Sequence, residues 1–201
     1  RYLYLSTAVL MMSAASPFAN AKGSSQAPMF TTEVERCILP AAQYHRVNQY
    51  ILRAILKVES NLNPTAVGKN DNGTIDVGIG QMNTIHFKEL RKHGITPDDL
   101  RDACVGTYVA AWHLSRVIAR HGNSWYGIAT YHSATPYFNH RYQILLNNEM
   151  VRSGAMAGKI LPVPPLRPSK AMQAKSKDPS GGQRGSHVAQ APKSLVFDSN
   201  Q

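Results

Sequence analysis

The amino-acid sequence predicts one mostly α-helical domain with a small turn-rich insertion, followed by a disordered basic tail. Three observations support this fold class. Apolar residues recur at intervals of three and four between residues 33 and 152, which is typical of amphipathic helices. The stretch "GKNDNGTIDVGIGQMN" is rich in Gly, Asn and Asp and too irregular for a helix. Residues 153–201 hold six of the twelve prolines and seven Lys or Arg against two Asp, with little to bury.

The chain begins with a segment typical of a secretory signal. Arg1 supplies a positive start, Leu3 to Met12 is a compact apolar run, and Ala19-Asn20-Ala21 fits a cleavage site between small residues. The apolar run has about half of the ~20 residues that a membrane span needs. We expect residues 1–21 to be a signal peptide, with an uncleaved N-terminal anchor as the alternative. The protein is then exported and periplasmic, with no transmembrane span after signal removal.

Residues 22–32 are predicted to be a short lead-in linker, and the domain is predicted to cover residues 33–152. Its helices are predicted over about 42–59, 85–93, a short segment from Pro97, 104–121, a short segment from Trp125, and 139–152. In the first of these, Ile51, Ala54 and Val58 share one face. Within the insertion, Asn72-Gly73 favours a small hairpin.

The predicted export affects the expected oxidation state of the two cysteines. Cys37 and Cys104 are 67 positions apart, without the close spacing of a zinc motif. In an oxidising compartment the pair predicts a disulfide. Two separate buried thiols are the alternative. The eight His include no H-E-x-x-H pattern or tight cluster, so neither a metal nor another cofactor is expected.

Glu59 stands where the first predicted helix ends, directly after Val58. The negative end of the helix dipole opposes ionisation of a nearby carboxyl, and so does desolvation by apolar neighbours. Both influences raise the pKa of Glu59, and a raised pKa is what a general acid needs near neutral pH. Position alone favours the alternative, a solvated glutamate at a helix end.

Three motifs begin at this acid and follow one another along the chain. They are "ESNLNP" from residue 59, "GIGQMN" from residue 78 and "ATYHSATP" from residue 129, and a tyrosine, Tyr142, follows in the last predicted helix. Together they supply the candidate site residues Glu59, Ser60, Gln81, Asn83, Tyr131, His132 and Tyr142.

In order and spacing, these motifs resemble those of the lytic transglycosylases with a goose-type-lysozyme-like (SLT) domain, over about residues 36–152. The wording of the third motif and the cysteine pair are most similar to the small exported enzymes of conjugation and type IV secretion systems. The resemblance implies a lysozyme-like fold for residues 33–152. It also implies cleavage of the β-1,4 bond between N-acetylmuramic acid and N-acetylglucosamine in peptidoglycan, with formation of a 1,6-anhydromuramic end.

The resemblance further implies that the enzyme opens the cell wall locally for a conjugation, secretion or pilus apparatus. Peptidoglycan strands and components of that apparatus are therefore the expected partners. The formal net charge of +10 would also suit nucleic acid. The chain has no recognised nucleic-acid-binding motif and carries an export signal, so nucleic acid is not expected.

The resemblance also implies roles for the site residues. Glu59 is the catalytic acid, and Ser60 and Gln81 are expected to hydrogen-bond the acetamido groups of the sugar or bound water. Tyr131 is expected to orient Glu59 through its hydroxyl. Asn83, His132 and Tyr142 are expected to support or contact the substrate.

The second and third motifs each depart from the family's pattern at one position. Gly80 stands where the family has a bulky residue, which predicts a roomier wall of the site. His132 stands where the family has Asn, and it would bring a group that titrates near neutral pH.

Two other function classes remain open. One is a lysozyme-type muramidase on the same scaffold, which would need a second carboxylate to activate water. Asp71 and Asp76 in the insertion are the nearest candidates, although both are also typical turn residues. The other is a non-catalytic glycan-binding scaffold.

Overall fold

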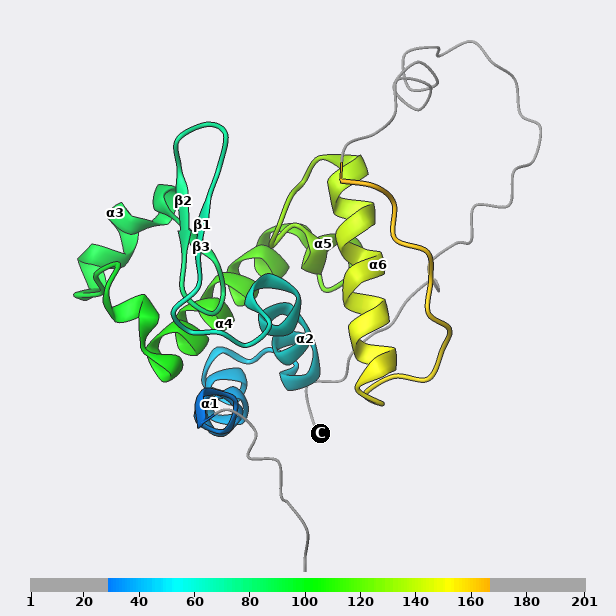
Figure 1. The fold of residues 1–201 in the computed structure, drawn as a ribbon, viewed down its shortest axis with the longest axis horizontal. Helices are drawn as coiled ribbons and strands as arrows, with labels where there is room; N and C mark the ends of the chain where they lie inside the picture. Colours follow the sequence, from blue (N-terminus) through cyan, green and yellow to red (C-terminus); the bar gives the residue numbers. More distant parts are fainter. Residues whose placement is uncertain (1–28, 167–201) are drawn as a thin grey trace, which may run out of the picture.

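The computed structural model describes residues 29–166, so the predicted signal peptide and the residues after 166 lie outside the described range. The described chain is mostly helical with one small sheet, which confirms the predicted fold class (Figure 1). In chain order the elements are α1 (Met29–His45), α2 (Gln49–Ser60), β1 (Val67–Lys69), β2 (Ile75–Val77), β3 (Met82–Asn83), the 3₁₀ turn η1 (Thr84–His86), α3 (Phe87–Leu90), the 3₁₀ turns η2 (Arg91–His93) and η3 (Asp99–Arg101), α4 (Ala103–His121), α5 (Trp125–Ala129) and α6 (Pro136–Arg152).

The first predicted helix is divided in two. Its opening residues, 42–45, belong to α1, and the chain breaks at Arg46, whose φ is 54°. Asn48 then caps α2, since its side chain accepts hydrogen bonds from the backbone N–H groups of Tyr50 and Ile51 at 2.9 and 3.1 Å. A left-handed residue followed by an Asn cap ends one helix and starts the next.

The predicted lead-in linker also differs from the structure. Residues 29–32 are helical and form the first turn of α1, ahead of the predicted domain boundary at residue 33. The apolar spacing of Val34, Ile38, Ala41 and Ala42, all buried, extends this helix to the core.

The insertion forms a three-stranded antiparallel sheet in the order β1-β2-β3. Val67 pairs with Val77, and Asp76 pairs with Asn83. The predicted hairpin is confirmed: its turn lies between β1 and β2, and Gly73 there has a φ of 82°. The sheet therefore carries Asp76 and the second motif on neighbouring strands.

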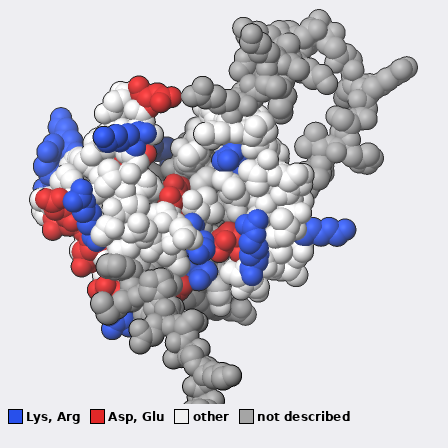
Figure 2. All heavy atoms as spheres, viewed as in Figure 1, with Lys and Arg blue, Asp and Glu red and all other residues white. Residues whose placement is uncertain are grey.

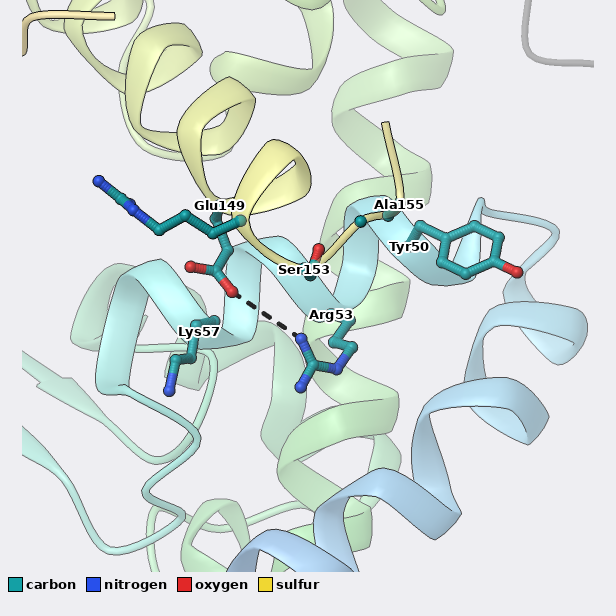
Figure 3. Close-up of a pocket in the computed structure, with 8 residues that line it drawn as sticks. Tyr50, Arg53, Lys57, Glu149, Ser153 and Ala155 are labelled. Carbon is teal, nitrogen blue, oxygen red and sulfur yellow. Dashed lines mark ion pairs between the residues drawn. The ribbon is translucent and has the colours of Figure 1, made fainter. Parts of the chain in front are cut away.

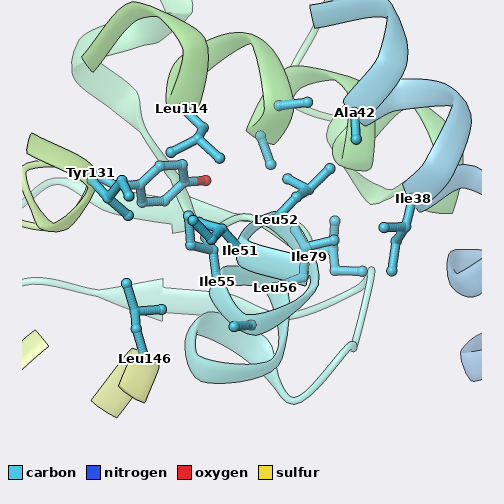
Figure 4. Packing of buried hydrophobic residues seen from close by; sticks show 14 of the residues in the cluster. Ile38, Ala42, Ile51, Leu52, Ile55, Leu56, Ile79, Leu114, Tyr131 and Leu146 are labelled. Atoms are coloured by element: carbon cyan, nitrogen blue, oxygen red, sulfur yellow. The ribbon is translucent and has the colours of Figure 1, made fainter. Parts of the chain in front are cut away.

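The helix α4 separates two hydrophobic cores. A small core lies under the sheet and α3 and consists of Val77, Met82, Leu90, Leu100 and Val109. A larger core brings together α1, α2, α4, α5 and α6, and its packing around α2 is drawn in Figure 4. Because α4 contributes to both cores, it fixes the sheet relative to the helices.

Cys37 of α1 and Cys104 of α4 are joined by a disulfide, with their Cα atoms 5.3 Å apart, which confirms the predicted pairing. The helix α4 begins just before this bond. Asp102 caps it, because its carboxylate accepts hydrogen bonds from the backbone N–H groups of Cys104 and Val105 at 2.9 and 2.8 Å.

The segment after α6 departs from the predicted tail. Residues 153–166, which we call the return segment, run back along α6 (Figure 1). The buried amide of Asn148 exchanges two hydrogen bonds of 2.8 Å with the backbone of Leu161. Nearer the start of α6, Tyr137 and Arg141 donate to the carbonyls of Pro165 and Pro164. A tail without packing therefore cannot begin at residue 153.

Within residues 29–166, no helix has both the length and the apolar character that crossing a membrane requires.

Candidate active site

Glu59 lies in the last turn of α2 and meets a tyrosine from α6. The hydroxyl of Tyr142 donates a hydrogen bond of 2.5 Å to Oε1 of Glu59. Tyr142 is buried, at 2% exposure, so its ring and hydroxyl are fixed by the main core. The helix ends directly after the acid, because Asn61 adopts a left-handed conformation and its N–H bonds back to the last turn.

Burial and, to a smaller extent, the negative charge of Asp76 raise the pKa of Glu59, whose net value is about 7. The hydrogen bond from Tyr142 acts in the opposite direction, since it stabilises the carboxylate. The balance leaves a carboxyl that is substantially protonated at neutral pH. This upward direction is the one predicted from the helix end and the apolar neighbours of Glu59.

The charge of this carboxyl acts on two buried phenols, Tyr131 and Tyr142. Burial, together with the negative charge of Glu59, raises the pKa of both Tyr131 and Tyr142 well above the usual range. Both phenols therefore stay neutral and remain hydrogen-bond donors at every physiological pH.

Ser60 connects α2 to the second motif. Its hydroxyl donates to the carbonyl of Ile79 at 2.8 Å and lies 3.2 Å from the carbonyl of Leu56, while accepting from the N–H of Asn63 at 3.1 Å. The first two motifs are thus joined by one side chain. In the structure the hydroxyl of Ser60 makes these hydrogen bonds within the protein. Its contact with a substrate stays a prediction.

Tyr131 does not orient Glu59, which corrects the predicted role. Its hydroxyl donates to the carbonyl of Gly80 at 2.8 Å, and Tyr142 makes the contact to Glu59 instead. Tyr131 comes from the turn after α5, so it joins the third motif to the second across 51 residues of sequence.

Gly80 does not open the wall of the site, which corrects a second expectation. A Cβ atom at this position would lie 2.7 Å from Cβ of Ala110 and 2.8 Å from the hydroxyl oxygen of Tyr131. The space that a bulky residue would fill is therefore occupied by α4 and Tyr131.

Gln81 and Asn83 hold the insertion together. The amide nitrogen of Gln81 donates to the carbonyl of Gly78 at 2.8 Å and to that of Ala66 at 3.3 Å. That of Asn83 donates to Oδ1 of Asp76 at 2.7 Å. Their predicted contacts with substrate are not tested by these bonds.

Asp76 is oriented from both sides. Besides Asn83 on Oδ1, Asn70 donates to Oδ2 at 2.8 Å. The carboxylate is close enough to Glu59 to raise the pKa of that acid, as described above. Asp71 instead lies exposed in the turn between β1 and β2. Of the two aspartates considered from sequence, Asp76 is therefore the one near the site.

His132 stacks on Tyr142. The ring centroids are 4.9 Å apart and the rings are nearly parallel, at 8°. Desolvation of the histidine lowers its pKa, the positive charge of Arg141 lowers it further, and Asp76 opposes both. His132 thus places an exposed polar ring on the phenol that holds the acid.

Two further histidines lie behind Tyr131 and were not singled out from sequence. The ring of His113 meets the ring of Tyr131 edge-on at 4.8 Å and lies 4.6 Å from the ring of His86. Burial lowers the pKa of His113 to about 4, so it is neutral. The two histidines are 27 positions apart and belong to no motif, so no local pattern indicates their contact.

The structure thus brings Glu59, Tyr142 and His132 together. Ser60 and Tyr131 fix the loop that carries Gly80, and Gln81 and Asn83 act within the insertion. Across the described range 29–166, no group of three or more His, Cys, Asp or Glu is arranged to hold a metal ion. A carboxyl protonated near neutral pH, positioned by a neutral phenol, is suited to general acid catalysis.

The sequence matches a known protein family. Residues 36–149 match the family described as "Transglycosylase SLT domain", and this match covers more than half of the chain and all three motifs.

Similar proteins include Invasion protein IagB from Salmonella typhimurium, which is 35% identical over 100 residues, covering 49% of this chain and 62% of that protein. Protein IpgF from Shigella flexneri is 32% identical over 100 residues, 49% of this chain and 66% of its own length. X polypeptide from Escherichia coli is 30% identical over 102 residues, 50% of this chain and 60% of its own length. The chain spans less than two thirds of each of these curated relatives.

Proposed function

The chain belongs to the Transglycosylase SLT domain family, and from this premise we propose that it is a peptidoglycan lytic transglycosylase with Glu59 as its single acid and base. The observation that carries this proposal is the state of Glu59. Burial raises the pKa of its carboxyl to about 7, and the hydroxyl of Tyr142 holds it at 2.5 Å.

In the proposed reaction, Glu59 gives its proton to the glycosidic oxygen between N-acetylmuramic acid and N-acetylglucosamine. The bond from this oxygen to C1 of the muramic residue breaks, and the 2-acetamido oxygen assists at C1. The carboxylate of Glu59 then takes the proton of the muramic 6-hydroxyl, whose oxygen attacks C1 and closes the 1,6-anhydro ring. The proton returns to Glu59 and no water is consumed.

A pKa near 7 suits both steps. A general acid and a general base work best when their pKa lies near the working pH, because both protonation states are then accessible. The hydrogen bond from Tyr142 supports the carboxylate form, which is the base of the second step. Burial supports the neutral form, which is the acid of the first step.

Asp76 favours the muramidase as the second candidate. A hydrolase that uses a second carboxylate needs it close enough to activate water, and Asp76 lies near Glu59 with both oxygens oriented by Asn70 and Asn83. These same bonds give Asp76 a structural role in the sheet, so we favour the transglycosylase.

Digestion of purified cell wall in ¹⁸O-water separates the two candidates. A transglycosylase leaves unlabelled 1,6-anhydromuramic ends, detected by mass spectrometry of the released muropeptides. Stoichiometric label at the new muramic end would establish a hydrolase. In that case Asp76→Asn should abolish the activity, whereas a transglycosylase should keep at least about a tenth of its rate.

Replacement of the acid separates an enzyme from a glycan-binding scaffold. Glu59→Gln keeps the shape of the side chain but has no proton to give, so wall degradation should fall by roughly 10² to 10⁴. Binding to wall, measured by co-sedimentation, should survive. Activity above about a tenth of the wild-type rate would move the catalytic role away from Glu59.

We also propose that the enzyme is exported and opens the wall locally for a conjugation, secretion or pilus apparatus. The predicted signal in residues 1–21 and the disulfide of Cys37 and Cys104 support an oxidising location. One similar protein is named Invasion protein IagB, and the name describes that protein. Fractionation of cells that produce the full chain tests the location, and periplasmic cross-linking tests contact with such an apparatus.

A further inference from the structure

A groove of about 580 Å³ lies between α2 and α6, away from the contacts of Glu59 described above. Three cationic side chains line it, together with one carboxylate, one aromatic ring and the first residues of the return segment (Figure 3). The charged and aromatic lining residues are Tyr50, Arg53, Lys57, Glu149 and Arg152.

The cations of this groove differ in their partners. Arg53 is held in place, because its Nε donates to Glu35 at 2.8 Å and its Nη1 lies 3.8 Å from Glu149. Lys57 and Arg152 form no ion pair with any residue in the range 29–166. The groove therefore contains two positive charges without an acidic partner among the described residues. On the face drawn in Figure 2, Lys and Arg side chains lie on both sides of an acidic one near the end of α6.

We propose that this groove binds the acidic peptide stem that the muramic residue of the substrate carries, with Lys57 and Arg152 meeting its carboxylates. The inference rests on the proposed function, since it concerns the same substrate. Tyr50 is 52% exposed and offers an apolar wall to the aliphatic parts of the stem. Arg53, fixed by Glu35 and Glu149, also lines the groove.

The distance between the acid and the groove suits a peptide stem. Tyr142 contacts Glu59, and Glu149 follows seven residues later on α6, so the groove begins about 10 Å further along the helix axis. A stem of three to five residues spans about 10 to 18 Å when extended. The stem is therefore long enough to cover the distance along α6 from a muramic residue at Glu59 to the groove.

Strands with and without stems test the proposal. The double variant Lys57→Gln, Arg152→Gln should lower kcat/KM about fivefold on strands that carry stems, as expected for the loss of two partly exposed ion pairs. On strands stripped of their stems by an amidase, the variant should match the wild type. The control variant Lys88→Gln, Arg91→Gln removes the same charge from exposed positions of α3 and η2 and should match the wild type on both substrates.

Titration of the soluble stem tetrapeptide provides a readout that needs no catalysis. Calorimetry should show binding to the wild type and at least fivefold weaker binding to the double variant. If the wild type cleaves neither substrate, the proposed function fails, and this titration still tests the groove.

Three outcomes would overturn the inference. One is an equal loss on both substrates, and another is no loss on either. The third is binding of a polyglutamate peptide without binding of the stem peptide, which would assign the groove to an acidic segment of a partner protein. A circular dichroism melt of the double variant excludes misfolding as the cause of any loss.

Discussion

The carboxyl of Glu59 is governed by neighbours from three elements. Burial at the end of α2 and the charge of Asp76 on β2 raise its pKa, while Tyr142 on α6 lowers it. A substitution that removes one of these influences should therefore move the pH dependence of the reaction in a direction that can be stated in advance.

Tyr142→Phe removes the hydrogen bond that stabilises the carboxylate, so the pKa of Glu59 should rise above 7. The limb on which activity falls as pH rises should then move to higher pH. The rate at the optimum should also fall, by about tenfold, because the acid is no longer held in position. A pH profile of kcat/KM on purified wall measures both effects.

Tyr131→Phe is the matched control. Its hydroxyl donates to Gly80 and not to Glu59, so the limb should stay in place. The variant should instead lose about 1–3 kcal/mol of unfolding free energy, because a buried carbonyl loses its donor. Equal shifts of the limb in the two tyrosine variants would contradict the assignment of Tyr142 as the partner of the acid.

At the scale of the elements, local sequence patterns predicted those helices and turns that depend on neighbouring residues alone. The spacing of Ile51, Ala54 and Val58 predicted the body of α2, and Asn72-Gly73 predicted the hairpin. Residues 29–41 of α1 were missed although Val34 and Ile38 have helical spacing, since Pro40 favours an interruption.

The site required contacts that no local pattern contains. Glu59 and Tyr142 are separated by 83 residues, and Tyr131 and Gly80 by 51. Sequence motifs indicated that these residues belong to one site, but only the packing of α5 and α6 decides which tyrosine reaches the acid. The role of Gly80 depends likewise on Ala110, which belongs to no motif.

The loop between β2 and β3 should tolerate little change at Gly80. In Gly80→Ala, the added methyl would meet Cβ of Ala110 and the hydroxyl of Tyr131 below 3 Å. We expect a loss of about 1–3 kcal/mol in unfolding free energy, measured by urea denaturation. Gly73→Ala has open space around its Cβ and serves as a control for the turn, where only its positive φ is strained. Unchanged stability of Gly80→Ala would show that the wall has the room predicted from sequence.

At the scale of the whole molecule, the return segment extends the folded unit beyond α6. Truncation after Arg152 removes both hydrogen bonds of the buried Asn148 amide and the partners of Tyr137 and Arg141. We expect this truncation to lower the melting temperature relative to that of a chain that ends after Leu166. Equal melting temperatures of the two shortened chains would show that residues 153–166 contribute nothing to stability.

The disulfide acts on the same scale because it closes a loop of 67 residues between α1 and α4. Replacement of both Cys37 and Cys104 by Ser should cost about 4 kcal/mol of unfolding free energy on the chain-entropy account. Urea denaturation of the oxidised wild type and of the double variant measures the difference. A loss below about 1 kcal/mol would show that α1 and α4 hold together without the bond.

The raised pKa of Glu59 also links folding to proton uptake. The ordinary pKa of this carboxyl is 4.5 and its folded value is about 7, so the native state binds the proton more tightly than the unfolded chain. The contribution to stability is fully present below pH 4.5 and is lost as pH rises through 7, by about 3 kcal/mol in total. Glu59→Gln has no such dependence. Its unfolding free energy, measured in urea at pH 5 and pH 8, should therefore gain on that of the wild type as pH rises, so that deleting the acid protects the fold against alkaline conditions.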